Sequence, residues 1–260
     1  MIRILFLITL LWSCNPKNTS TNTVLSEPRD YEVRLDTTTL FDASRNRNIP
    51  VAYYSANTKV NLDNQPVVIF SHGYNENRPG GNLSYAGFCN FLASKGFFVV
   101  SIQHELATDS LLPMTGIPQI TRRSNWERGA ENIKFVLNHL KSQKTNRYDF
   151  QKVSLIGHSN GGDMSMLFAH KYPDQINKVI SLDNRRMLLP RTKSPQVYSL
   201  RSSDQPADEG VLPTEEEMKE FNITVIKLPN TIHNHMDDEG TQEQIDEINR
   251  YLLAFLTTGD

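Results

Sequence analysis

The chain has 260 residues, enough for one large α/β domain or two small ones. Hydrophobic residues make up 38% of the sequence and the formal net charge is -2, which describes an ordinary globular protein. The chain has no surplus of basic residues, and this argues against nucleic acid as a partner.

The N-terminus forms a separate segment. Arg3 precedes an apolar stretch over residues 4–12, which is too short to span a bilayer as a helix. A positive start followed by a short apolar core is typical of a secretory signal. We therefore predict a signal peptide over residues 1–13, followed over residues 14–30 by a flexible tether rich in Asn, Thr and Ser.

The end of this segment also resembles a bacterial lipobox. Leu11-Trp-Ser-Cys14 has the required cysteine, although Trp12 stands where a small or β-branched residue is usual. The resemblance implies that Cys14 is acylated and becomes the new N-terminus. The expected product is exported to the bacterial cell envelope and held at a membrane by a lipid. A plain secretion signal with an incidental cysteine is the alternative.

Residues 31–260 are predicted to form one domain, because no linker, repeat or second hydrophobic belt interrupts them. Cys89 is then the one cysteine of the domain, so no internal disulfide can form. It lies among apolar residues on an expected helix, and we expect it to be a buried small hydrophobe.

Hydrophobic periodicity gives the order of the elements. Alternating patterns over residues 31–35 and 49–53 predict antiparallel strands at a sheet edge. Continuous apolar runs are typical of strands buried on both faces; they cover residues 66–71, 97–102, 153–156, 178–182, 196–200 and 223–228. Helical patterns cover residues 83–94, 124–141, 163–170 and 241–256. Strands that alternate with helices predict an α/β fold with a mostly parallel sheet covered on both faces.

The most informative motif is Gly157-His-Ser-Asn-Gly161, between a buried strand and a helix. Strand, sharp turn and helix are what a nucleophile elbow requires, with Ser159 at its tip. Glycines on either side remove collisions between this tight turn and the adjacent strand and helix. We predict that Ser159 is a nucleophile.

A serine hydroxyl needs a base to take its proton and donors to stabilise the oxyanion. His233 and His235 both follow the last strand, and we prefer His233 as the base. The expected oxyanion donors are the backbone N–H groups of Asn160 and Tyr74.

Two aspartates qualify as the acid that orients the histidine. Asp204 follows the strand at 196–200, and Asp183 ends the strand at 178–182. We prefer Asp204 slightly, because the strand before it is the one that usually carries the acid in folds with such an elbow. The other carboxylate would then cap a turn or pair with an arginine.

Other polar residues have two interpretations each. Arg185 and Arg186 either bind a carboxylate or phosphate of the substrate or belong to a solvated basic loop. His104 is expected to be a pocket wall or to lie just behind it. Tyr85 and Trp126 either line an acyl pocket or pack in the core.

The sequence resembles the α/β-hydrolase superfamily, and within it the dienelactone-hydrolase-like and platelet-activating-factor-acetylhydrolase-like branch. The resemblance is carried by Ser71-His-Gly-Tyr74, Ser101-Ile-Gln-His104, Gly157-His-Ser-Asn-Gly-Gly162, Ser181-Leu-Asp183 and His233. The resemblance runs from about residue 66 to the C-terminus. It implies a serine hydrolase that acts on a small ester through an acyl-enzyme, with Ser159 as nucleophile, His233 as base and neither metal nor organic cofactor. In that acetylhydrolase the acid follows the strand equivalent to 178–182, which would favour Asp183.

Two other functions are kept as alternatives. His233-Asn-His235-Met-Asp237 has the spacing of metal ligands, which would suit a metal-dependent hydrolase. The fold could also belong to a surface binding protein that has lost its activity. The first leaves the serine elbow unexplained, and the second leaves the retained serine, histidine and acid unexplained.

Overall fold

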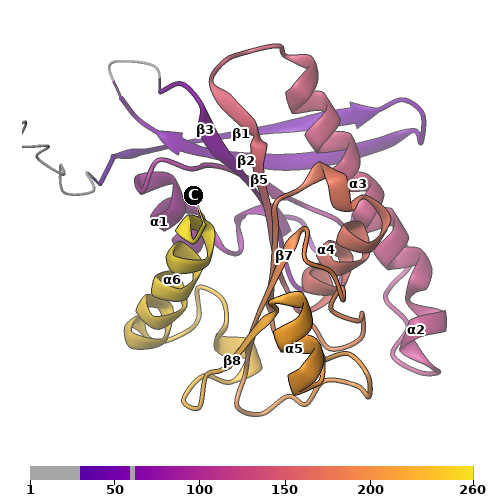
Figure 1. Cartoon of the computed structure of the whole chain (residues 1–260). Helices are drawn as coiled ribbons and strands as arrows, with labels where there is room; N and C mark the ends of the chain where they lie inside the picture. The colour runs from indigo at the N-terminus through magenta and orange to yellow at the C-terminus, as the bar shows by residue number, and fades with distance from the viewer. Residues whose placement is uncertain (1–29, 59–61, 260) are drawn as a thin grey trace, which may run out of the picture.

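A twisted sheet of eight strands runs through the computed structural model, which describes residues 30–58 and 62–259 (Figure 1). The expected signal peptide, Cys14 and nearly all of the tether lie outside these residues. Their assignment stays a prediction. No helix within the described residues is long and apolar enough to cross a membrane.

The sheet is parallel except at one edge. Its strand order is β1-β2-β4-β3-β5-β6-β7-β8; β1, β2 and β4 pair antiparallel, and β3 to β8 run parallel. The strands are β1 (Val33–Asp42), β2 (Arg47–Ala56), β3 (Gln65–Ser71), β4 (Phe98–Ile102), β5 (Tyr148–His158), β6 (Lys178–Leu182), β7 (Gln196–Arg201) and β8 (Thr224–Lys227). This is the α/β architecture that the sequence predicts.

Helices cover both faces of the sheet (Figure 1). On one face lie α1 (Ala86–Ser94) and α6 (Gln242–Thr257); on the other lie α3 (Arg123–Ser142), α4 (Ser159–Lys171) and α5 (Glu215–Phe221). Successive residues of β3 alternate between the two cores: Val67 and Ile69 pack toward α3 and α4, and Val68 and Phe70 toward α1 and α6. Burial on both faces explains why the strand sequences are continuously apolar.

The core confirms the expectation for Cys89, which is fully buried and free on the face covered by α1 and α6. Trp126 is also fully buried.

The structure adds helices that periodicity does not reveal. α5 has no buried residue, so its sequence carries no apolar stripe; its local signal is the capping box formed by Thr214 and Glu217. A short α2 (Pro118–Thr121) lies within a stretch expected to be irregular. The helix expected from residue 83 begins at Ala86, after a 3-10 turn over Gly81–Leu83.

Candidate active site

Ser159 lies at the junction of β5 and α4, in a backbone conformation that side chains rarely adopt. Its φ is 51°, in the left-handed region. A Cβ on Gly157 would come within 2.3 Å of the carbonyl oxygen of Gly161, and one on Gly161 would come within 2.3 Å of that of Ser71. Both glycines are therefore needed for the turn to pack against its own helix and against β3. The strand, turn and helix predicted around Ser159 are all present.

The imidazole of His233 lies between a hydroxyl and a carboxylate. Its Nε2 is 3.0 Å from Ser159 Oγ, and its Nδ1 is 2.6 Å from Asp183 Oδ2. His233 begins a 3-10 turn (His233–His235) after β8, while Asp183 directly follows β6 at a φ of 58°. Three chain segments that are far apart in sequence thus meet at the carboxyl edge of the sheet, where ligands bind in sheets of this kind.

Asp183 is held in the ionised, accepting state. Its side chain is fully buried; it accepts hydrogen bonds from the backbone N–H and the hydroxyl of Ser202 at 3.0 and 2.6 Å, and it pairs with Arg201 at 2.8 Å. Burial alone raises the pKa of the Asp183 carboxyl, but the hydrogen bond from His233 and the charge of Arg201 outweigh it, so the pKa is below its usual value.

This geometry corrects the preference for Asp204. Asp204 Oδ1 accepts a hydrogen bond from the backbone N–H of His233 at 2.7 Å, so it holds the main chain and not the ring. The ring nitrogen Nδ1 of His233 contacts Asp183 instead. Both aspartates thus contact His233, Asp183 at the ring and Asp204 at the backbone N–H.

His158, which precedes Ser159, links three loops around the site. Its Nε2 lies 3.1 Å from the carbonyl oxygen of His233, and its Nδ1 lies 2.6 Å from the hydroxyl of Tyr85. That hydroxyl accepts a hydrogen bond from the backbone N–H of Gly73 at 3.1 Å. Because the His233 carbonyl can only accept, Nε2 carries the proton and Nδ1 accepts from Tyr85.

The pKa of His158 is lowered to about 3, first by burial and then by the neighbouring His233, so the ring is neutral at physiological pH. Sequence reasoning missed this role. The signal was the position of His158 inside the elbow motif, between a glycine and the serine.

A buried polar network supports the elbow from beneath. The Asn160 side chain accepts from Trp126 Nε1 at 2.8 Å and donates to Glu105 Oε1 and Asn125 Oδ1 at 3.0 and 2.9 Å. Trp126 therefore packs in the core, and its indole N–H donates to the side chain of Asn160, the residue after Ser159. Because the Asn160 side chain is buried, the group of this residue that could face a substrate is its backbone N–H, at the start of α4.

Two cavities meet at Ser159. One, of about 580 Å³, is lined by His158, Tyr85 and the segment Asp237 to Glu239; the other, of about 220 Å³, is lined by Asn160, Asp163 and the arginines Arg122, Arg185 and Arg186. Tyr74, Ser159 and His233 line both. Tyr74 and Asn160 thus lie beside Ser159, and their oxyanion role stays a prediction.

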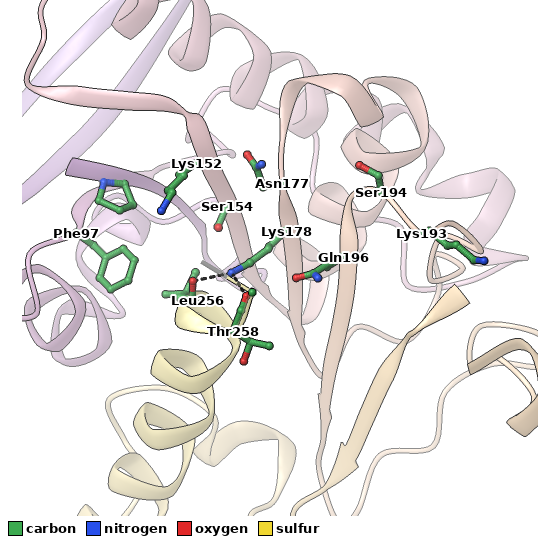
Figure 2. Close-up of a pocket in the computed structure, with 12 residues that line it drawn as sticks. Phe97, Lys152, Ser154, Asn177, Lys178, Lys193, Ser194, Gln196, Leu256 and Thr258 are labelled. Carbon is green, nitrogen blue, oxygen red and sulfur yellow. Dashed lines mark hydrogen bonds between the residues drawn. The ribbon is translucent and has the colours of Figure 1, made fainter. Parts of the chain in front are cut away.

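A further cavity of about 280 Å³ lies at the amino edge of the sheet, away from Ser159 (Figure 2). Of the residues that the structure describes, three lysines line it, Lys152, Lys178 and Lys193, but no histidine or carboxylate does.

Two other expectations concern histidines. His104 is fully buried with its Nε2 2.9 Å from Ser71 Oγ, and it lines neither cavity at Ser159; it lies behind the wall. The metal alternative required His233, His235 and Asp237 to converge. Over residues 30–58 and 62–259, no three His, Cys, Asp or Glu side chains form a group that could hold a metal ion.

The comparisons with known proteins agree with this architecture. A family model described as serine aminopeptidase, S33, matches residues 63–182. No curated protein sequence gives a significant match. Among solved structures, the chain is similar to the esterase Est22, at 12% identity and a TM-score of 0.64, covering 89% of this chain and 83% of that one.

An esterase of Pyrobaculum calidifontis matches at 13% identity and a TM-score of 0.61, with 86% and 84% covered. A Klebsiella pneumoniae protein provisionally assigned as a dienelactone hydrolase matches at 13% identity and a TM-score of 0.62, with 87% and 99% covered. Likeness at such identities establishes the fold alone. With the parallel sheet, the elbow and the family-model match over the segment that carries β3 to β6 and the elbow, the chain has the α/β-hydrolase fold.

Proposed function

We propose that the protein is a serine hydrolase that cleaves carboxylic esters through Ser159, His233 and Asp183. The observation that carries this proposal is the continuous chain of contacts from Ser159 Oγ through both nitrogens of His233 to the buried Asp183 carboxylate. Esterases are among the solved structures that share the fold, which fits an ester as the substrate.

The first half of the proposed reaction acylates the enzyme. Ser159 Oγ attacks the ester carbonyl while His233 Nε2 takes the hydroxyl proton. Asp183 keeps the Nδ1 proton of His233 in place and stabilises the imidazolium that forms. The backbone N–H groups of Asn160 and Tyr74 receive the oxyanion, and His233 then protonates the departing alcohol.

The second half releases the acid. Water enters, His233 takes its proton, and the resulting hydroxide attacks the acyl group on Ser159. Collapse of the second tetrahedral intermediate returns the proton to Ser159 Oγ. The neutral His158 beside His233 adds no competing positive charge to this step.

Labelling with a fluorophosphonate tests the proposal, because this probe phosphonylates an activated serine. The wild-type protein should be labelled and should hydrolyse 4-nitrophenyl butyrate, and Ser159→Ala should lose both, with kcat reduced by about a millionfold. Ser84→Ala is the matched control: Ser84 lines the larger cavity, but its hydroxyl bonds the carbonyl oxygen of Gly80 and should leave labelling intact. An active enzyme that resists the probe and is inhibited by a chelator would contradict the proposal.

A further inference from the structure

The two cavities that meet at Ser159 carry opposite charge. The larger contains Asp237, Asp238 and Glu239, and no lysine or arginine from residues 30–58 or 62–259 lines it. The smaller contains three guanidinium groups and one carboxylate, that of Asp163. A substrate that spans the nucleophile therefore meets a negative environment on one side and a positive one on the other.

The carboxylate of Asp163 offsets part of the charge of Arg122 and Arg186, but within the described residues it forms no hydrogen bond or ion pair with a guanidinium group of this cavity. It is buried, and its Oδ1 accepts hydrogen bonds from the backbone N–H groups of Arg186 and Met187 at 3.0 and 2.8 Å. The Asn184 amide donates to the same oxygen at 3.2 Å. Asp163 is thus used to hold the loop after β6 in place.

Two of the three guanidinium groups bond only to neutral acceptors. Arg122 donates through Nε to the carbonyl oxygen of Pro113 at 2.9 Å, and Arg185 donates to the Pro206 carbonyl at 3.1 Å and to the Gln205 side chain. Among the described residues, no carboxylate forms an ion pair with either. Arg186 does pair with a carboxylate, that of Asp208. Each guanidinium has five N–H donors, so donors remain for a ligand.

The arginines are also close enough to repel one another. The pKa of Arg122 is below its usual value, first because of partial burial and then because of the charge of Arg186. An anion between them would relieve this repulsion. Apolar contacts from Leu112 and Met114 complete the cavity wall and suit the short carbon chain that would carry such an anion.

We propose that this arginine-lined cavity binds an anionic group, a carboxylate or a phosphate, at one end of the ester substrate. The proposal rests on the esterase function above and gives its substrate class: short esters with one charged end. Guanidinium forks match both anions through paired hydrogen bonds. The acidic cavity on the other side of Ser159 would repel the same group, so the charge also sets the direction in which the substrate lies.

Matched pairs of esters test this. In the acyl arm, 4-nitrophenyl hydrogen glutarate is compared with 4-nitrophenyl methyl glutarate, which differs by one capped carboxylate. In the alcohol arm, the acetate esters of 4-hydroxybenzoate and of 4-hydroxyphenyl phosphate are compared with that of 4-hydroxybenzamide. The quantity measured is the ratio of kcat/KM for the anionic ester to that for the neutral ester. The alcohol arm also separates carboxylate from phosphate.

The kcat/KM ratio should exceed one in at least one arm. Arg122→Met and Arg185→Met should each lower this ratio by roughly tenfold to a hundredfold, because each removes a charge-assisted hydrogen bond to the anion. Arg122→Lys should retain part of it, and added salt should lower it in the wild type. Arg123→Met is the matched control, because Arg123 follows Arg122 directly as the first residue of α3 but pairs with Glu127 outside the cavity. Melting curves identify a variant that fails to fold, and the other arginine variant then decides.

A ratio of one or less in both arms would overturn the proposal, as would a ratio that both folded arginine variants leave unchanged. Failure of the esterase function has a different signature. In that case neither the neutral nor the charged esters are hydrolysed, and Ser159 is not labelled by the fluorophosphonate.

Discussion

Cationic side chains line a cavity at each edge of the parallel sheet, but the two sets have different surroundings. At the amino edge, Lys178 points to the end of α6 and donates to the carbonyl oxygens of Leu256 and Thr258 at 2.7 and 2.8 Å (Figure 2). Those carbonyls are the unpaired acceptors at a helix C-terminus, and their partial negative charge favours a cation there. Lys178 therefore stabilises the fold.

At the carboxyl edge the guanidinium groups of Arg122 and Arg185 donate to the loop carbonyl oxygens of Pro113 and Pro206. Within the described residues neither donates to a helix C-terminus, and each has further N–H donors. Ser159 and His233 lie at the same edge. A cluster of cations therefore indicates a ligand only where acceptors within the fold leave some of its donors unused. The two edges should respond differently to substitution.

The largest effect is expected at the carboxyl edge, from the two aspartates that contact His233. Asp183→Asn should lower kcat by about ten-thousandfold, because an amide cannot hold His233 in the required tautomer and cannot stabilise the imidazolium. Asp204→Asn should lower it less than about tenfold, because the amide oxygen can still accept from the backbone N–H of His233. Steady-state kinetics with 4-nitrophenyl butyrate measures both. Equal losses, or a larger loss for Asp204→Asn, would show that the acid is assigned wrongly.

The second variant addresses the amino edge. Lys178→Met should lower the free energy of unfolding by about 2 kcal/mol, because two charge-assisted hydrogen bonds to the end of α6 are lost. It should leave kcat/KM unchanged, since the residue lies at the edge away from Ser159. Urea unfolding and ester hydrolysis measure the two quantities.

Lys193→Met is the control for this variant. Lys193 lines the same cavity but is exposed, so its replacement should change stability by less than about 0.5 kcal/mol. If Lys178→Met reduced kcat/KM at full stability, the amino-edge cavity would have a role in catalysis and the contrast between the edges would fail.

Much of the fold and the turn that carries Ser159 could be predicted because the information is local. A strand, two glycines, a serine and a helix follow one another within the elbow, and the steric need for Gly157 and Gly161 follows from the turn itself. The buried strands can be predicted equally well, because burial on both faces gives each strand a continuous run of apolar residues in the sequence. His233 could be located from its place after the last strand.

The carboxylate that contacts the ring of His233 could not be predicted, because Asp183 and Asp204 both follow strands that end at the same edge and both contact His233. What separates them is the atom contacted, a ring nitrogen or a backbone N–H, and no sequence spacing encodes that difference. The link between Tyr85 and His158 is hidden for a similar reason. It joins residues 73 apart in the sequence, and Tyr85 also packs with buried apolar residues of the core.

The smallest effect on kcat is expected from the hydrogen bond between Tyr85 and His158. Tyr85→Phe removes the hydroxyl that donates to His158 Nδ1 and accepts from the backbone N–H of Gly73, the residue before the expected oxyanion donor Tyr74. We expect kcat to fall about fivefold to tenfold, the value of roughly one hydrogen bond. The cause would be a less rigid oxyanion loop and a less fixed His158.

Tyr54→Phe is the matched control, because Tyr54 is buried in the same core and its hydroxyl has no hydrogen-bond partner among the described residues. Deleting an unpaired buried hydroxyl should leave kcat unchanged and stability equal or slightly higher. If both tyrosine variants had the same kcat as the wild type, the hydrogen bonds of Tyr85 would serve packing alone. The carboxyl edge would then resemble the amino edge, with buried polar groups that hold the fold and take no part in positioning the reaction.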